Sequence, residues 1–364
     1  MDSYIERRLL RLRKSIAAKG LDAALIFGPE NRFYFSGFFA EDLGCNESSG
    51  ALLITRDENF LLTDGRYKEQ AEKEAKGFLI KIYKKGLVNL LKGLLKELSV
   101  RYCGYEPGYI SVSAFNKLKK GLVFVYFKEL GGFPERLRTQ KDKHEINIIK
   151  KSQEICEKVF EQALKEIKPG ISEKEIAFTI LKGLYERAQG PSFPPIVASG
   201  PNSSLPHAVP TDRKIGESEP IIIDMGARYK GYCSDMTRTL IVGKAPKRVK
   251  EIYAIVKKAQ SIAQKKIRAG MSARQADAVA RSVIEEAGYG EYFCHGLGHG
   301  VGIAIHEAPA LSFRNRKKLV SDSIITVEPG IYLPGKFGVR LENMGVVTEK
   351  GLEIITSNKW YYDF

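Results

Sequence analysis

The feature that most constrains the fold of this chain is a faint internal repeat. Residues 170–190 read GISEKEIAFTILKGLYERAQG, and residues 270–290 read GMSARQADAVARSVIEEAGYG. Each copy has a glycine, an apolar residue, a serine suited to capping a helix, a helical stretch and a terminal glycine. A long helical segment precedes each copy, and a glycine-containing stretch with histidine follows it. The repeat predicts two helix-pair and sheet units that face each other around a central cleft.

The chain changes character near Thr139. With 364 residues, it is longer than one ordinary compact domain, so we expect two domains. The first part alternates short apolar runs of strand length with helical segments, which is typical of an α/β domain. A long amphipathic segment begins at His144 and leads into the repeat. We therefore predict an α/β domain over residues 1–135 and an α+β domain with a pseudo-twofold repeat over residues 136–364.

Composition and cysteine usage bear on where the protein works. Hydrophobic residues make up 43% of the chain and charged residues 28%, as in a soluble globular protein. The first residues, MDSYIERRLLRLRKS, lack the apolar core of a signal peptide, and no apolar run reaches the roughly 20 residues of a membrane span. The cysteines are odd in number and scattered, which indicates reduced thiols: Cys45, Cys103, Cys156, Cys233 and Cys294. We expect a cytoplasmic protein without a membrane partner.

The formal net charge of +15 raises the hypothesis that the protein binds nucleic acid or an anionic membrane. The basic residues are spread along the chain and have acids nearby, as in EKEAKG and KKSQEICEKVFEQ. No RNP-like motif or zinc-finger spacing accompanies them. We therefore interpret the charge as a solvated Lys/Glu-rich surface and predict no nucleic-acid partner.

Histidines cluster in the second part of the chain. Four of the five lie there: His207, His295, His299 and His306. Three belong to the stretch HGLGHGVGIAIHE, whose alternating glycines argue against the helix that the zinc motif HExxH needs. In an extended backbone, His295 and His299 share a face, and the glycines let a ligand or another strand approach closely. The clustering favours a functional site, but histidine alone leaves open whether it binds metal or transfers a proton.

Acidic residues at predicted strand ends strengthen the case for a metal site. In PIIIDMGARYKGYCSDMTRTLIV, Asp224 ends one strand and Asp235 opens the next. Glu328 follows the apolar run SIITV, and Glu342 lies on the alternating segment GVRLENMGVVT. Each acid taken alone fits a turn cap or a surface acid. Buried in apolar strands, however, carboxylates need a partner, and four of them with one imidazole can hold a pair of divalent cations such as Mn, Co or Zn.

The ordered set IIIDMGA, SDMTRT, HGLGHGVG, VEPGIY and VRLEN resembles the pita-bread metallopeptidases, in particular the proline-specific branch of Xaa-Pro aminopeptidases and prolidases. The segment IVASGPNSSLPHAVP resembles the loop of that branch that carries a substrate-facing histidine. NRFYFSGF and TDGRYKEQA resemble the creatinase-type N-terminal domain. The resemblance spans nearly the whole chain and is most specific over residues 190–345. It implies a creatinase-like α/β domain followed by a pita-bread catalytic domain.

The resemblance also implies roles for individual residues. The implied metal ligands are Asp224, Asp235, His299, Glu328 and Glu342. In the family, the equivalents of Asp235 and Glu342 bridge two metals, Asp224 completes one, and the other two ligands complete the second. The implied catalytic residues are Glu328, which handles the proton of the attacking water, and His306 and His207, which stabilise the oxyanion. The implied substrate-binding residues are His207, His295, His306 and Arg340.

Two positions depart from the family pattern. Asn343 stands where an acid often follows Glu342, and Ala208 stands where glycine often follows the loop histidine. These departures bear on fine specificity, because none of the implied metal ligands is changed.

The implied reaction is hydrolysis of the peptide bond between an N-terminal residue and a following proline. The resemblance further implies two divalent cations as cofactors (Mn or Co first, Zn as the other candidate), Xaa-Pro peptides as substrates, and a homodimer. We predict an Xaa-Pro aminopeptidase, with a prolidase restricted to dipeptides as the alternative, because both use the same ligands.

Three other functions are compatible with parts of this pattern. A methionine aminopeptidase shares the ligands, but the proline-branch loop and the large N-terminal domain argue against it. A creatinase-like hydrolase keeps the fold but loses ligands, and none is lost here. A non-catalytic binding module of the same fold is the alternative from a different class, and the complete ligand set argues against it.

Overall fold

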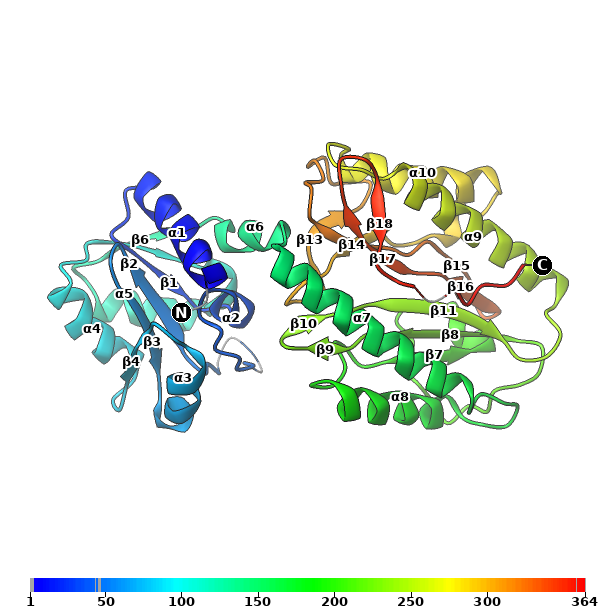
Figure 1. Cartoon of the computed structure of the whole chain (residues 1–364), viewed down its shortest axis with the longest axis horizontal. Helices are drawn as coiled ribbons and strands as arrows, with labels where there is room; N and C mark the ends of the chain where they lie inside the picture. The colour runs from blue at the N-terminus through cyan, green and yellow to red at the C-terminus, as the bar shows by residue number, and fades with distance from the viewer. Residues whose placement is uncertain (1–2, 43, 45–46, 358, 364) are drawn as a thin grey trace. The chain divides into compact units, whose positions relative to one another are not determined.

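A computed structural model describes residues 3–42, 44, 47–357 and 359–363 of the chain, which divides into two compact units, Met1–Arg138 and Thr139–Phe364 (Figure 1). Each unit has its own hydrophobic core. Cys45 lies outside the described residues, and the other cysteines are free thiols. None of the described helices is both long enough and apolar enough to cross a membrane.

The first unit is an α/β domain, as predicted. Its mixed sheet has the order β4-β3-β2-β1-β5-β6. The strands are β1 (Ala23–Ile26), β2 (Ala51–Thr55), β3 (Asn59–Thr63), β4 (Leu79–Ile82), β5 (Tyr102–Tyr105) and β6 (Tyr126–Glu129). The helices are α1 (Ser3–Ala18), α2 (Pro29–Ser36), α3 (Lys68–Glu74), α4 (Leu87–Glu97), α5 (Val112–Gly121) and α6 (Phe133–Thr139), with 3-10 turns η1 (Gly65–Tyr67) and η2 (Pro107–Tyr109).

The central strands of this sheet are buried on both faces, which explains why they are continuously apolar in the sequence. On one face, Ala23 and Leu25 share a core with the leucines of α4 and with Leu118 of α5. Strand β1 runs parallel to β5 and antiparallel to β2. The carboxyl ends of β1 and β5 therefore meet at one edge of the sheet.

The second unit contains two halves of similar construction. The first half pairs α7 (Lys143–Leu164) and α8 (Glu173–Arg187) with the sheet β11-β8-β7. Its strands are β7 (Ile196–Ser199), β8 (Pro220–Met225) and β11 (Met236–Ile241), with the small ribbon β9 (Arg228–Tyr229) and β10 (Tyr232–Cys233), and the 3-10 helix η3 (Gly200–Ser204) follows β7.

The second half pairs α9 (Lys247–Lys266) and α10 (Ala273–Glu286) with the sheet β13-β12-β14-β17-β18. Its strands are β12 (Gly298–Gly300), β13 (Glu307–Leu311), β14 (Ile324–Val327), β17 (Asn343–Val347) and β18 (Leu352–Ile354). The hairpin β15 (Gly330–Leu333) and β16 (Phe337–Arg340) and the 3-10 turn η4 (Gly290–Tyr292) complete this half.

The predicted internal repeat is confirmed down to single hydrogen bonds. Ser172 and Ser272 each form a capping box with the residue three positions later. The glycines two positions before these serines both have positive φ, and each donates its N–H to a carbonyl of a following loop, at Ile215 and Leu319. The matching serines also form equivalent isolated bridges, with Lys214 and Lys318.

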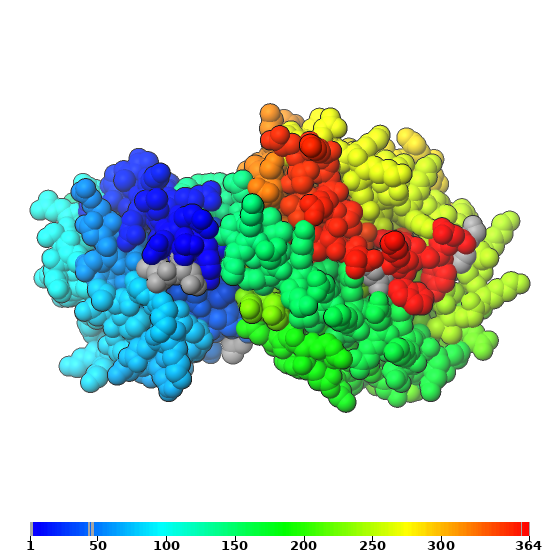
Figure 2. Space-filling model, in the orientation of Figure 1, coloured from blue at the N-terminus to red at the C-terminus, as the bar shows by residue number. Residues whose placement is uncertain are grey.

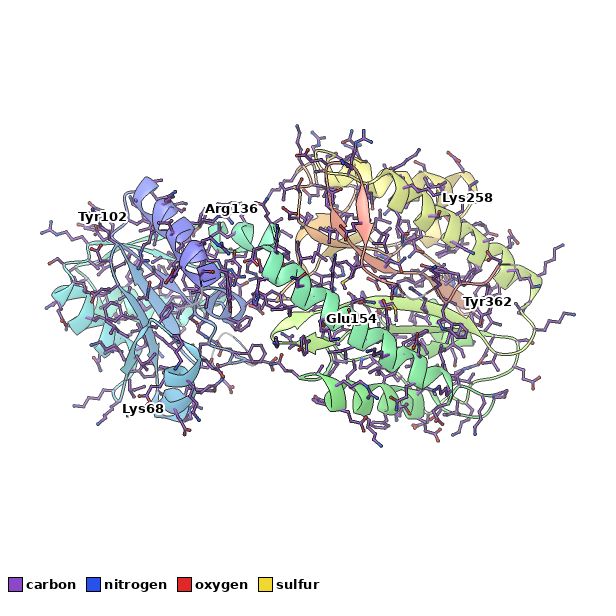
Figure 3. The ribbon with its side chains drawn as sticks, in the orientation of Figure 1. Lys68, Tyr102, Arg136, Glu154, Lys258 and Tyr362 are labelled. Atoms are coloured by element: carbon purple, nitrogen blue, oxygen red, sulfur yellow. The ribbon has the colours of Figure 1, made fainter. Side chains whose placement is uncertain are left out.

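The C-terminal segment of the chain lies along α7 on the face shown in Figure 2. Lys150 of α7 pairs with Glu353 at 2.8 Å, and the backbone N–H of Ser357 donates to Glu157. Elsewhere on α7, exposed Glu154 pairs with Lys151 at 2.8 Å (Figure 3). Positive and negative side chains are thus interspersed on this surface.

Candidate metal centre

The acids that stood out in the sequence occupy the ends of strands from both halves of the second unit. Asp224 lies near the end of β8, opposite Thr237 of β11, and Asp235 directly precedes β11. Glu328 directly follows β14, and Glu342 lies between β16 and β17. All four side chains lie in an interior that the apolar strands enclose.

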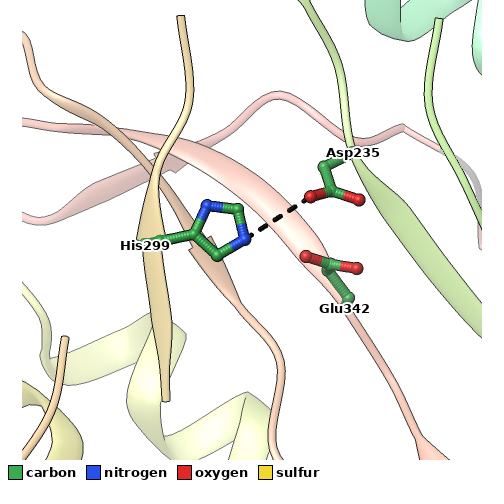
Figure 4. Close-up of side chains that lie close together, drawn as sticks. All are labelled: Asp235, His299 and Glu342. Atoms are coloured by element: carbon green, nitrogen blue, oxygen red, sulfur yellow. Dashed lines mark ion pairs between the residues drawn. The ribbon is translucent and has the colours of Figure 1, made fainter. Parts of the chain in front are cut away.

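Three of the predicted ligands form a tight cluster (Figure 4). Asp235, His299 and Glu342 each offer one ligand atom, and these atoms lie within 4.8 Å of one another. Nε2 of His299 is 3.5 Å from Oδ2 of Asp235 and 3.3 Å from Oε1 of Glu328. The fold therefore brings acids from both halves to the Nε2 atom of a single imidazole.

One hydrogen bond decides which nitrogen of His299 faces this cluster. Nδ1 lies 3.1 Å from the carbonyl oxygen of Gly300, and a carbonyl can only accept, so Nδ1 is the protonated nitrogen. Nε2 is left to point at the acids. An imidazole whose other nitrogen donates to a backbone carbonyl is the arrangement typical of a metal ligand.

Three carboxylate oxygens at the site have no hydrogen-bond partner among the described residues although they are buried: Asp224 Oδ1, Asp235 Oδ1 and Glu342 Oε1. A buried carboxylate oxygen without a partner is costly in free energy. A cation would satisfy all three. Oxygen and imidazole donors of this kind suit Mn, Co or Zn, so the residues fit the cations that the sequence predicts.

The electrostatics of the cluster agree with this fit. Burial, reinforced by the neighbouring acids, raises the pKa of Asp235 and of Glu342 well above their usual range. Burial also acts to raise the pKa of Glu328, but the hydrogen bond and charge of His299 outweigh it and hold that pKa at about 2. The charge of Arg340 acts in the opposite direction to burial on Asp235 and Glu342, whereas His299 acts mainly on Glu328.

Arg340 connects Asp224 to His295, the first histidine of the HGLGHGVG stretch. Its Nη2 donates to Asp224 Oδ2 at 2.6 Å, and its Nη1 donates to the hydroxyl of Tyr332 at 2.9 Å. That hydroxyl lies 2.9 Å from Nε2 of His295, whose Nδ1 lies 2.8 Å from the carbonyl of Gly296. The Nε2 atom of His295 therefore faces a tyrosine hydroxyl, whereas that of His299 faces carboxylates.

Three residues of the site were not predicted from the sequence: Thr237, Thr326 and Tyr332. Thr237 donates to Glu342 and accepts from Arg340 Nε. Thr326 donates to Glu328 and accepts the backbone N–H of His299. Both threonines lie two positions from a predicted ligand, and residues two apart on a strand share a face. That spacing was the signal that could have identified the two threonines.

The predicted site residues line one cavity of about 570 Å³: His207, Asp224, Asp235, His295, His299, His306, Glu328, Arg340 and Glu342. The remaining wall is mainly apolar and includes Phe193, Pro194 and Pro195. His207 and His306 are exposed, whereas the acids are buried or nearly so. The cavity thus has an acidic floor, two exposed imidazoles and an apolar wall.

Glu173 holds the loop that carries His207. One of its oxygens accepts from the N–H and hydroxyl of Ser199, and the other accepts from Asn202 and from the N–H and hydroxyl of Thr211. Both ends of the loop are thus bonded to one buried carboxylate. Asn343, where the family often has an acid, bonds to Arg238 and Tyr361 instead.

Two facing sheet-and-helix halves around a buried cluster of carboxylates and imidazole define a metal-dependent hydrolase. The chain matches metallopeptidase family M24 over residues 147–349 and the creatinase/prolidase N-terminal domain over residues 8–140. It belongs to metallopeptidase family M24, with a creatinase-type N-terminal domain. The fold class and the family resemblance predicted from the sequence are therefore confirmed.

Known relatives match along their whole length. The Xaa-Pro dipeptidase of Pyrococcus furiosus is 36% identical over 98% of this chain and 99% of its own. The structure of an Xaa-Pro dipeptidase from Bacillus anthracis is 38% identical, with a TM-score of 0.91 over 97% of this chain and 98% of its own. The structure of an X-Pro aminopeptidase from Thermotoga maritima is also 38% identical, with a TM-score of 0.87 over 95% of this chain and 98% of its own.

Proposed function

We propose that this metallopeptidase hydrolyses the peptide bond between an N-terminal residue and a following proline. The observation that carries the proposal is the set of buried carboxylate oxygens without partners, on Asp224, Asp235 and Glu342, around Nε2 of His299. A bound cation would satisfy these oxygens and offset the free-energy cost of burying them. The names of the relatives, which are Xaa-Pro dipeptidases and an X-Pro aminopeptidase, supply the substrate class.

The residues that would hold two divalent cations are Asp224, Asp235, His299, Glu328 and Glu342. When bound, two such cations supply Lewis acidity that polarises a carbonyl and lowers the pKa of a water molecule. We propose Mn or Co as the metal, with Zn as the other candidate, because mixed carboxylate and imidazole donors suit all three.

Protein side chains then handle the protons and the oxyanion. Glu328 lines the cavity 3.3 Å from His299, and its carboxylate would accept the proton of the attacking water and pass it to the departing imino nitrogen. His306 and His207 line the same cavity and are exposed to an incoming peptide. We propose that both donate hydrogen bonds to the oxyanion.

His295 and Arg340 complete the substrate side of the cavity. The nitrogens of His295 are engaged by Gly296 and Tyr332, and Arg340 bonds to Asp224 and Tyr332. We propose that they support the substrate by packing and by holding Asp224 in place. Phe193, Pro194 and Pro195 offer an apolar wall for a proline ring.

The aminopeptidase and prolidase functions remain the two candidates. The names of the relatives favour the prolidase at least as well as the aminopeptidase. One feature favours longer peptides: Arg340, the guanidinium at the cavity, already bonds to Asp224, Tyr332 and Pro206. A dipeptide presents its carboxylate next to the scissile bond, where a free cation would be needed to neutralise it.

A paired assay tests the function. Xaa-Pro dipeptides and Xaa-Pro-Yaa tripeptides are incubated with the protein and Mn or Co, and release of the N-terminal residue is measured. Cleavage of tripeptides supports the aminopeptidase, and cleavage of dipeptides alone supports the prolidase. No cleavage of either by the metal-loaded protein would overturn the proposal. Asp235→Asn is the control, and equal activity in this variant would overturn the metal assignment.

We also propose that residues 136–364 carry the reaction and that residues 1–135 support a cytoplasmic homodimer without nucleic-acid or membrane partners. The interspersed ion pairs of the surface, such as Lys151 with Glu154, support a solvated rather than a nucleic-acid-binding face. Light scattering on the purified protein tests the dimer, and a monomeric mass would contradict it.

A further inference from the structure

We propose that Lys141 is a positioning residue for His306 and that it acts through a buried ion pair with Glu307. Neither residue of this pair is among the predicted ligands or catalytic residues. The proposal rests on the proposed function only in taking His306 as the group that contacts the reacting peptide.

The ion pair is short and nearly inaccessible to solvent. Nζ of Lys141 lies 2.5 Å from Oε1 of Glu307, and the two side chains are 1% and 7% exposed. Lys141 is itself held firmly, because its backbone N–H donates to the carbonyl of Asp322 at 2.9 Å. The next residue, Asp142, forms the capping box that starts α7. The backbone from which the ammonium group extends is therefore held in place.

Glu307 lies directly after His306 and begins β13, where it pairs with Gly300 of β12. Its carboxylate packs against Gly302, because a Cβ built on that glycine would lie 2.2 Å from Oε1. The carboxylate thus fills space that the absent side chain of Gly302 leaves open. Residues 302–307 form a turn that carries His306. The contact between Glu307 and Gly302 joins the end of this turn to its beginning.

The beginning of the turn is anchored as well. The backbone N–H of Cys233 donates to the carbonyl of Gly302 at 2.7 Å, and its thiol lies 3.3 Å from the carbonyl of Ile303. Cys233 ends β10, two positions before the predicted ligand Asp235. The turn is therefore held at one end near the metal ligands and at the other end by Lys141.

His306 itself has no hydrogen bond from its ring to any described residue. Its ring packs edge-to-face against His299, with the ring centroids 4.3 Å apart and the planes at 68°. Among the described residues, this contact and the backbone on either side therefore set the direction of the imidazole. A buried lysine–glutamate pair adds little net stability, so its main consequence here is the geometry that it imposes on the neighbouring histidine.

A double-mutant cycle tests this role. The variants are Lys141→Met, His306→Ala and the combination, with kcat, KM and bound metal per chain measured for each. We expect Lys141→Met to lower kcat about 10- to 100-fold with KM and metal content unchanged. In the His306→Ala background, the same substitution should change kcat less than about twofold. Losses that multiply in the combined variant would overturn the proposal.

Two further variants separate positioning from folding. Lys141→Met removes the ammonium group beside a buried carboxylate, whereas Lys141→Met with Glu307→Gln removes both charges and should fold even where the single variant does not. We expect the variant with both substitutions to lose as much kcat as Lys141→Met alone. Lys150→Met is the matched control, because it breaks the exposed pair with Glu353 in the same unit and should leave kcat unchanged. A wild-type kcat in the variant that carries both Lys141→Met and Glu307→Gln would overturn the proposal.

A readout without substrate keeps the test independent of the proposed function. The chain has five histidines, so the ring resonance of His306 can be assigned by NMR with His306→Ala. We expect that resonance to shift in Lys141→Met, whereas the control Lys150→Met should leave it unchanged. An unchanged His306 resonance would overturn the positioning role. If no peptide is cleaved by the wild-type protein, only the proposed function fails.

Discussion

At the residue scale, His295 and His299 show how two similar positions acquire different roles. They lie four apart in one glycine-rich stretch, and each has Nδ1 on a neighbouring backbone carbonyl. Their Nε2 atoms differ, because Tyr332 bonds to that of His295 whereas Asp235 and Glu328 face that of His299. The residue types and spacing were visible in the sequence, but the partner of each Nε2 depends on strands that are distant along the chain.

The acids at the site make a prediction about the metal-free protein. Asp235→Asn removes one of several buried carboxylates that repel one another, and burial already raises the pKa of Asp235. We expect the variant to lose metal binding and yet to gain about 1–3 kcal/mol in free energy of unfolding without metal. Urea denaturation in chelator at pH 8 measures this gain.

The matched control is Asp212→Asn, which changes an exposed acid in the same unit. Its effect on the free energy of unfolding should stay within about 0.5 kcal/mol. If the free energy of unfolding of metal-free Asp235→Asn is lower than that of the metal-free wild type, the acids do not repel one another as we infer.

At the element scale, β12 approaches β14 closely because its first residue is glycine. A Cβ on Gly298 would lie 2.2 Å from the carbonyl oxygen of Thr326 and 2.6 Å from its hydroxyl oxygen. That hydroxyl bonds to the backbone N–H of His299 and to Glu328. The glycine therefore lets one threonine hold two predicted ligands.

Gly298→Ala should disturb this arrangement. We expect it to lower the free energy of unfolding by about 1–3 kcal/mol and to weaken metal binding about 10- to 100-fold. Calorimetric titration with Mn gives the affinity. Gly93→Ala in α4 is the control, because nothing lies within 4 Å of its Cβ, and alanine favours a helix. Unchanged metal affinity in Gly298→Ala would contradict the role of the close approach.

In the first unit, Glu106 ties the carboxyl ends of β1 and β5 together. Its Oε2 accepts from the backbone N–H groups of Phe27 and Gly28, and its Oε1 accepts from Asn31. Burial nevertheless dominates and raises the pKa of Glu106 to about 7. The folded protein therefore holds a proton on this carboxyl group at pH values where the unfolded chain has lost it.

This raised pKa predicts a loss of stability as the pH rises. Below the unfolded pKa of about 4.5, Glu106 is protonated in both states and adds no pH dependence. Between there and pH 7, the folded state binds the extra proton, so the free energy of unfolding falls by roughly 3 kcal/mol and then levels off. Urea denaturation of wild type and Glu106→Gln at pH 5 and pH 8 measures the difference. Equal pH dependence in both proteins would contradict it.

At the scale of the whole molecule, the predicted ligands come from both halves of the second unit. Asp224 and Asp235 belong to the half built on β8 and β11, and the other three belong to the half built on β12, β14 and β17. Each half has its own core. Cations bound by ligands from both halves would therefore link two separately packed parts of the unit.

Metal should accordingly stabilise the folded protein. With free Mn at 100 times its dissociation constant, we expect the free energy of unfolding to rise by about 2.7 kcal/mol. Thermal unfolding with and without Mn measures the shift, and chelator should reverse it. The same rise in Asp235→Asn would show that Mn acts elsewhere on the molecule.

The sequence by itself determined the local features of this protein: the apolar strands, the capped helices, the internal repeat and the residue types of the site. These features depend on neighbours within a few positions, through periodicity, capping and short motifs. Thr237 and Thr326 could have been inferred in the same way, from their spacing to Asp235 and Glu328.

Only the tertiary structure decided which atoms meet. The pair of Lys141 with Glu307 joins residues 166 positions apart, and the bond of Arg340 to Asp224 joins residues 116 positions apart. Such contacts depend on how strands pair and halves pack, and local patterns carry little information about them. For the same physical reason, the carboxylates without partners, and with them the case for bound cations, became visible only in the folded chain.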